Sequence, residues 1–153
     1  MQNRRAAREA ALKSLYAVEV GKNTPQDAVK QIIKRSLRDD HDSIRFAEKL
    51  MMVTVDYASE YDLIIDNHIK NWEVDRLAVI DKLILRMALS ELLRFKEIPT
   101  KVSINEAIEL AKKFSTRNSG NFVNGILDAA LTHLKEENKI NKEGRGLIEE
   151  SNH

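Results

Sequence analysis

The chain has 153 residues, with 25 lysines and arginines, 24 aspartates and glutamates, and a formal net charge of +1. A charge so close to neutral does not indicate a class of partner, so any electrostatic signal must lie in local clusters. The absence of cysteine excludes disulfides, thiolate metal sites and cysteine nucleophiles. With 42% hydrophobic and 32% charged residues, the composition is typical of a globular protein with a charged surface, which we expect in the cytoplasm.

Apolar residues at helical spacing predict the first helices. Residues 4–20 read RRAAREAALKSLYAVEV, in which apolar side chains recur on one face until a glycine ends the pattern. Thr24 followed by Pro25 is typical of a second helix start. Helical spacing then continues over residues 39–72, with a break expected near Ser59.

The most apolar segment covers residues 75–95, and a helix that is apolar nearly all round is expected at the centre of a fold. Five glycines and two prolines in the whole chain favour long helices over a turn-rich β fold. We therefore predict an all-α protein: a compact bundle of about seven helices, with no strand. It should form one domain over residues 1–136, followed by a charged, solvated tail over residues 137–153, where helical periodicity is lost.

Residues 101–128 read KVSINEAIELAKKFSTRNSGNFVNGILD and place a polar stretch between two apolar helical segments. A capping box beginning at Ser103 predicts the start of the first of these helices. Asn118 or Ser119 is a suitable N-cap for the second. Gly125 lies inside that second helix, where we expect the close approach of a neighbouring helix to compensate for its cost.

The polar stretch, TRNSGN, is a candidate anion site because backbone N–H groups point outward at a helix N-terminus. An ordinary helix–helix loop is the alternative.

Arg4, Arg5 and Arg8 crowd the first turn of the first predicted helix, where the macrodipole disfavours each cation by about 0.3–1 kcal/mol. Arg4 and Arg8 are also four residues apart and repel each other on a helix. Their placement favours an anionic partner such as phosphate, which would supply the counter-charge. The alternative is a solvated basic surface without a binding role.

Motifs that would indicate an enzyme are missing from the sequence. The histidines at positions 41, 68, 133 and 153 lie far apart, and no HExxH spacing, P-loop or GxGxxG fingerprint occurs. We therefore expect that the protein is not an enzyme.

Three segments together resemble the NusB transcription antitermination family: RRAAREAALKSLY, DRLAVIDKLILRMALSELL and IPTKVSINEAIELAKKFSTRNSGNFVNGILD. The resemblance covers about residues 4–131. It implies a NusB-like fold of two helical sub-bundles. It also implies binding to a single-stranded boxA element of nascent RNA together with NusE, a small-subunit ribosomal protein. The complex would join the RNA polymerase elongation complex with other Nus factors and support ribosomal RNA transcription, without catalysis, cofactor, metal or membrane.

The resemblance also implies site residues. The family's arginine-rich start matches the three arginines, which are expected to contact RNA phosphates or bases, although Ala6 stands where members often have another basic residue. The loop over residues 118–122 matches a second part of the RNA surface, with Asn118 in place of an acidic residue of some members. The implied RNA-binding residues are Arg4, Arg5, Arg8, Asn118, Ser119 and Phe122. Phe122 could instead pack in the core, since it lies on the apolar stripe of its helix.

Tyr16 and Asp81 match the NusE-facing surface of the family. The alternatives are a half-buried packing role for Tyr16 and a favourable dipole interaction for Asp81 in the first turn of a helix.

Two other functions are compatible with the sequence. The chain could be a non-catalytic interaction module that binds NusE or forms a homodimer without specific RNA binding. It could also be part of an enzyme, since NusB-like domains occur fused to ribosomal RNA cytosine methyltransferases, but we expect 153 residues to leave no room for the catalytic domain.

Overall fold

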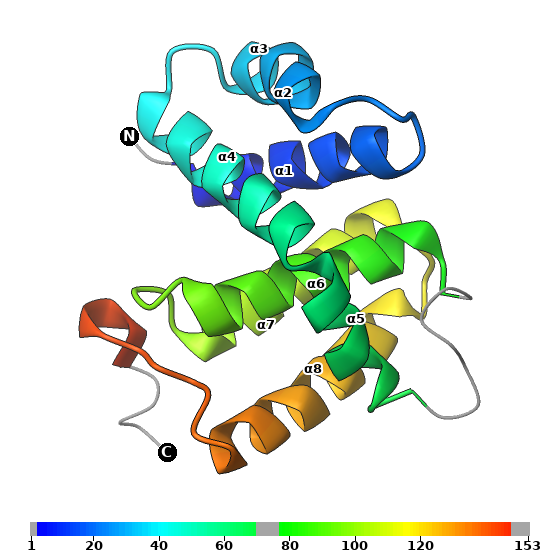
Figure 1. Ribbon diagram of the computed structural model, residues 1–153, viewed down its shortest axis with the longest axis vertical. Helices are drawn as coiled ribbons and strands as arrows, with labels where there is room; N and C mark the ends of the chain where they lie inside the picture. The colour runs from blue at the N-terminus through cyan, green and yellow to red at the C-terminus, as the bar shows by residue number, and fades with distance from the viewer. Residues whose placement is uncertain (1–2, 70–76, 148–153) are drawn as a thin grey trace. The chain divides into compact units, whose positions relative to one another are not determined.

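The computed structural model describes residues 3–69 and 77–147, and within these ranges every regular element is helical, which confirms the all-α prediction (Figure 1). The chain divides into two compact units, Met1–Tyr57 and Ala58–His153. The predicted helix start at Asp75 and the end of the predicted 39–72 segment lie outside the described residues. No helix of the described ranges has the length and apolar character needed to span a bilayer.

The first unit is built on two sixteen-residue helices, α1 (Arg4–Glu19) and α4 (His41–Asp56), which pack against each other. Between them in sequence lie α2 (Pro25–Ala28), a π-helical turn (Val29–Ile33) and α3 (Lys34–Leu37), all of which pack on α1 (Figure 1). The Thr24 hydroxyl accepts from the Asp27 amide, which confirms the predicted helix start there. The buried apolar side chains of this unit include Ala7, Ala11, Leu12, Leu15, Ile33, Ala47, Leu50 and Met51.

The second unit comprises α5 (Ala58–Asp66), α6 (Val79–Arg94), α7 (Thr100–Phe114), α8 (Ser119–Glu136) and a 3₁₀ turn (Gly144–Leu147). As its nearly continuous apolar pattern predicts, α6 is central: it packs against α5, α7 and α8 and is buried on most of its surface. The break between α4 and α5 falls at Tyr57, two residues before the predicted position.

Two predictions about local structure are wrong. The capping box at Ser103 does not form, because α7 begins three residues earlier, directly after Pro99 in an extended conformation. Ser103 is instead buried and donates a hydrogen bond of 2.9 Å to Glu91 Oε1 of α6. The close helix approach occurs at Gly120, where a Cβ would lie 3.3 Å from Lys112 Cγ, whereas nothing lies within 4 Å of a Cβ at Gly125.

Part of the C-terminal segment differs from the solvated tail that the sequence predicts. Lys142 is buried, and its Nζ donates hydrogen bonds of 2.9 Å to the carbonyls of Glu91 and Phe95 at the end of α6. A lysine near a helix C-terminus satisfies carbonyls that have no partner within the helix. Gly146 lies so close to the Lys96 carbonyl that a Cβ would collide with it. A charged sequence without periodicity is therefore held here by specific polar contacts.

Candidate nucleic-acid interface

The arginines at the start of α1 occupy three different environments. Arg8 is only 4% exposed, and its Cζ lies 5.3 Å from the centre of the Phe46 ring of α4. Arg4 is half-buried, with its Cζ 4.0 Å from the same ring. Arg5 is exposed. The aromatic face stabilises two of the cations at the start of the helix, and Arg5 is the most exposed of the three arginines.

Polar contacts hold the N-terminal ends of α1 and α4 together. The Asn3 side chain caps α1 by accepting from the Ala6 amide, and the Asn3 amide donates to Ser43 Oγ at 2.8 Å. Ser43 donates through its hydroxyl and its amide to Asp40, which caps α4. These hydrogen bonds hold the pKa of Asp40 below its ordinary value. The network fixes the first turn of α1 and therefore the direction in which its arginines leave the helix.

The start of α8 is organised by the Ser119 hydroxyl. α8 begins at Ser119 after Asn118, as the sequence predicts, but the Asn118 side chain makes no capping bond and is exposed. Ser119 is 3% exposed, and its hydroxyl lies 3.1 Å from Asp81 Oδ2 and 2.9 Å from Thr116 Oγ1. Ser119 therefore shapes the loop from inside, while Asn118 presents its amide to solvent.

Asp81 is one of the residues that line a pocket at this loop. The pocket has a volume of about 530 Å³ and is lined by Leu77, Ala78, Asp81, Thr116, Asn118, Ser119 and Phe122. Asp81 is only 8% exposed, and its Oδ1 has no hydrogen-bond partner among the described residues. A buried carboxylate oxygen without a donor is costly, so the pocket favours a ligand that brings a hydrogen-bond donor.

Phe122 is the aromatic side chain in the lining of this pocket and is 36% exposed. Phe122 lies on the apolar stripe of α8, so the sequence alone also allowed it to pack in the core. In the structure, the neighbouring Val123 is the fully buried residue instead. An accessible aromatic face beside a polar loop is suited to stacking on a planar group. The sequence expectations assigned Phe122 and Asp81 to different partners, whereas the structure places them in one pocket.

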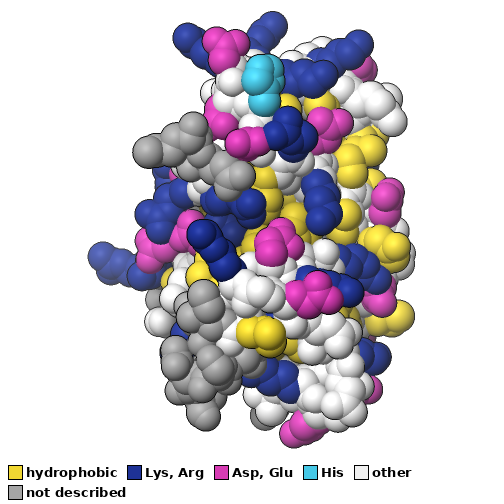
Figure 2. Space-filling view, turned by 90° about the vertical axis from the view of Figure 1, so that its left-hand side faces the viewer, with side chains coloured by type: hydrophobic (Ala, Val, Ile, Leu, Met, Phe, Trp, Pro, Cys, Tyr) yellow, Lys and Arg dark blue, Asp and Glu magenta, His cyan; other side chains and the backbone are white. Residues whose placement is uncertain are grey.

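The remaining predicted residue, Tyr16, lies on α1 in the first unit and is 42% exposed. Val20, four residues further along the chain at the end of α1, is also exposed, so these two side chains form a small apolar surface there. Figure 2 shows Lys and Arg side chains interspersed with Asp and Glu on the face that it draws, which agrees with the near-neutral net charge.

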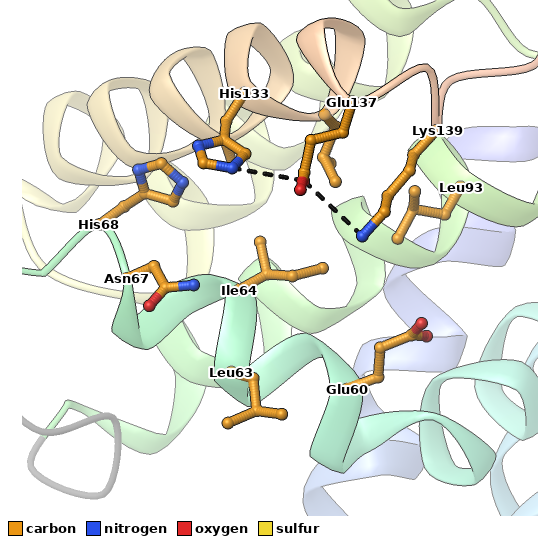
Figure 3. A pocket seen from close by; sticks show the side chains of 11 residues that line it. Glu60, Leu63, Ile64, Asn67, His68, Leu93, His133, Glu137 and Lys139 are labelled. Atoms are coloured by element: carbon orange, nitrogen blue, oxygen red, sulfur yellow. Dashed lines mark ion pairs between the residues drawn. The ribbon is translucent and has the colours of Figure 1, made fainter.

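A second pocket in the same unit as Asp81 was not anticipated from the sequence. It has a volume of about 310 Å³ and lies between α5, α6 and α8 (Figure 3). The rings of His68 and His133 meet edge to face with centroids 5.8 Å apart, and His133 pairs with Glu137, which also pairs with Lys139. Burial, with a smaller effect from His133, lowers the pKa of His68 below its ordinary value.

Comparison with known proteins identifies the class of fold and then the family. A solved structure of NusB from T. maritima is 35% identical, with a TM-score of 0.76, and the match covers 86% of this chain and 93% of that one. A structure described as antitermination factors NusB and NusE in complex with dsRNA matches at 28% identity with a TM-score of 0.78, covering 85% of this chain and 96% of that one. The fold is therefore NusB-like, as the sequence resemblance implies.

The sequence comparisons agree with the fold. The model of the NusB family matches residues 5–132. The transcription antitermination protein NusB of Salinibacter ruber is 47% identical over 148 residues, covering 97% of this chain and 92% of that protein. The chain belongs to the NusB family.

Proposed function

We propose that this protein is a transcription antitermination factor that binds boxA-type single-stranded RNA together with NusE. In this proposal it joins the RNA polymerase elongation complex in the cytoplasm and supports ribosomal RNA transcription without catalysing a reaction. Family membership supports the proposal, as does the similarity to a NusB that was solved with NusE and dsRNA.

The observation that carries the RNA-binding part of the proposal is the pocket at the start of α8. Phe122 offers an accessible ring on which a base can stack, and Asn118 offers donor and acceptor groups beside it. Arg5 is exposed and can contact phosphate, whereas Arg4 and Arg8 pack over the Phe46 ring of α4. Ser119 acts through the loop that it holds rather than by reaching the RNA itself.

Asp81 and Tyr16 are the residues that we assign to NusE. The Asp81 Oδ1 can accept a hydrogen bond from a basic side chain of NusE that enters the pocket. Since Phe122 lines the same pocket, RNA and NusE would meet there, and each would favour binding of the other. Tyr16 offers an exposed aromatic side chain of the kind that is enriched in protein interfaces.

The Asp81→Lys variant tests this arrangement by calorimetric titration with NusE, with and without boxA-type RNA. Lysine places a cation where a basic side chain of the partner should lie, so NusE binding should weaken while helix content by circular dichroism remains. Because the variant also loses the hydrogen bond from Ser119, Ser119→Ala is measured beside it and should weaken NusE binding less. Undiminished NusE binding by a folded variant would place the interface elsewhere. The control is Lys101→Glu at an exposed position of α7, which changes the net charge by the same amount in the opposite direction.

The second candidate function is an interaction module that binds NusE or a second copy of itself without specific RNA recognition. The exposed apolar side chains of Tyr16 and Val20 favour it, because exposed apolar groups are suited to contact with another protein. In that case RNA affinity should not respond to removal of Arg5, and the mass in solution should double if a homodimer forms.

A further inference from the structure

A basic surface lies on the segment that connects α1 with α4 and is separate from the arginines of α1. Between Asp27 and Asp39 the sequence contains no acidic residue and four cations, Lys30, Lys34, Arg35 and Arg38. All four side chains are exposed, and none of the four has an ion-pair partner among the described residues. We call these four residues the α2–α3 basic cluster.

The helical segment brings these cations close together along the chain. The turn from Val29 to Ile33 is π-helical, and the Lys34 amide donates to the Val29 carbonyl five residues earlier. Lys30 lies in this turn, and Lys34 and Arg35 begin α3 directly after it, four and five residues further along the chain. Val29 and Ile33 are buried, so the opposite side of the segment faces solvent. The result is a concentration of positive charge that no described carboxylate neutralises.

Arg38 occupies a backbone conformation that does not suit arginine. It ends α3 with φ of 50° and ψ of −109°, a combination that glycine adopts readily and other residues rarely adopt. Glycine is the common residue just after a helix, so an arginine at this position costs stability that glycine would not. Strained backbone clusters at binding and functional sites, so the Arg38 side chain is a candidate for ligand binding.

We propose that the α2–α3 basic cluster binds the phosphate backbone of the RNA outside the boxA element, without reading its sequence. This inference rests on the proposed function, because it assumes that the chain binds RNA. A row of solvent-facing cations on a short helical segment fits a polyanion, since each cation that neutralises a phosphate releases a counterion. Phosphate contacts position a nucleic acid, whereas base contacts specify it, so this surface should lengthen the binding site and not sharpen its selectivity.

The test compares two RNAs, a boxA element alone and the same element with single-stranded extensions on both sides, in the presence of NusE. In the wild-type protein, the extended RNA should bind more tightly and with a steeper dependence on salt. Replacing all four cations by glutamine should remove most of that advantage. The salt slope for the extended RNA should fall by about 0.7 for each phosphate that the variant no longer neutralises. Affinity for boxA alone, and its preference over a scrambled sequence, should remain.

Two variants keep the outcome interpretable. Arg38→Gly should melt at the same temperature as the wild type or higher, because glycine relieves the backbone strain at this position. It should still bind the extended RNA more weakly than the wild type does. Lys101→Gln removes one exposed cation from α7 and should leave the advantage of the extended RNA unchanged. An unchanged ratio of affinities for the two RNAs in the quadruple variant would overturn the proposal. Failure of the wild type to distinguish boxA from a scrambled RNA would instead overturn the proposed function.

Discussion

Ser119 donates a hydrogen bond of 3.1 Å from its hydroxyl to Asp81 Oδ2, which connects the first turn of α8 with the first turn of α6. Both residues are buried, and the other carboxylate oxygen of Asp81 finds no donor among the described residues. The bond holds the loop before α8 against α6, so it sets the shape of the pocket in which Phe122 lies.

The Ser119→Ala variant should therefore destabilise the second unit. It removes a donor from a buried carboxylate, which costs about 1–3 kcal/mol. Chemical denaturation measures the change, and Ser36→Ala, which removes an exposed hydroxyl from α3, should change the free energy of unfolding by less than about 0.5 kcal/mol. Equal stabilities of the two variants would show that the Ser119–Asp81 bond does not hold the loop.

Substitutions of Arg5 and Arg8 should separate RNA binding from folding. Arg8→Gln removes a buried guanidinium beside Phe46 and should lower the free energy of unfolding by about 1–2 kcal/mol. Arg5→Gln should leave stability within about 0.5 kcal/mol of the wild type, since Arg5 is exposed. It should lower the salt slope of RNA binding by about 0.7 if it removes one phosphate contact. Loss of stability in Arg5→Gln with unchanged RNA binding would reverse these assignments.

Phe122→Ala should weaken RNA binding by about 1–3 kcal/mol, the range measured for aromatic residues that stack on a base. Fluorescence titration with boxA-type RNA gives the change. Val123→Ala is the matched control, because its side chain is 0% exposed and its truncation should reduce stability without removing an RNA contact. If Phe122→Ala lowered only the melting temperature, core packing would be its role.

Stability should fall in mild acid because of His68. Its pKa is lowered from an ordinary value of 6.5, mainly by burial and also by the charge of His133. The unfolded chain therefore binds the proton more readily, so this contribution to stability is complete above pH 6.5 and is lost as the pH falls from there to the folded pKa. As the pH falls through that window, the melting temperature of the wild type should fall relative to that of His68→Gln.

An NMR titration of the His68 ring provides the check on the cause. His133→Gln removes the neighbouring charge and should raise the pKa of His68 towards its ordinary value, with the larger share of the shift remaining because burial persists. A pKa of His68 at the ordinary value in the wild-type protein would contradict this explanation.

Lys142→Met should release the segment that follows α8. It removes the ammonium group that donates to the Glu91 and Phe95 carbonyls, so the segment that leads into the 3₁₀ turn at Gly144–Leu147 is held less firmly to the end of α6. Hydrogen exchange of the Glu143 amide, which donates to the Lys96 carbonyl, should become faster. Lys139→Met changes an exposed lysine and should leave that exchange rate unchanged.

Much of the fold could be predicted from the sequence, because apolar periodicity marks helices directly. The central place of α6 follows from its apolar residues on all sides, and the start of α2 follows from Thr24 and Pro25. The prediction of a capping box at Ser103 was wrong because a serine and a glutamate three residues apart can also lie within a helix. There, a buried partner such as Glu91 competes for the serine hydroxyl.

The candidate site was less accessible to sequence reasoning. The cluster of arginines is visible in the sequence, but Phe46, which lies under two of them, is about forty residues away in the chain and carries no local signal. Asp81 and Ser119 are separated by 38 residues, so their shared pocket depends on the packing of α6 against α8. The attachment of Lys142 depends on tertiary contacts in the same way.

The most direct test of the central claim is a fluorescence titration of boxA-type RNA and a scrambled control, with and without NusE, at several salt concentrations. The proposed function predicts selective binding of boxA that tightens when NusE is present and weakens as salt rises. Equal, weak and salt-sensitive binding of both RNAs, unaffected by NusE, would contradict it.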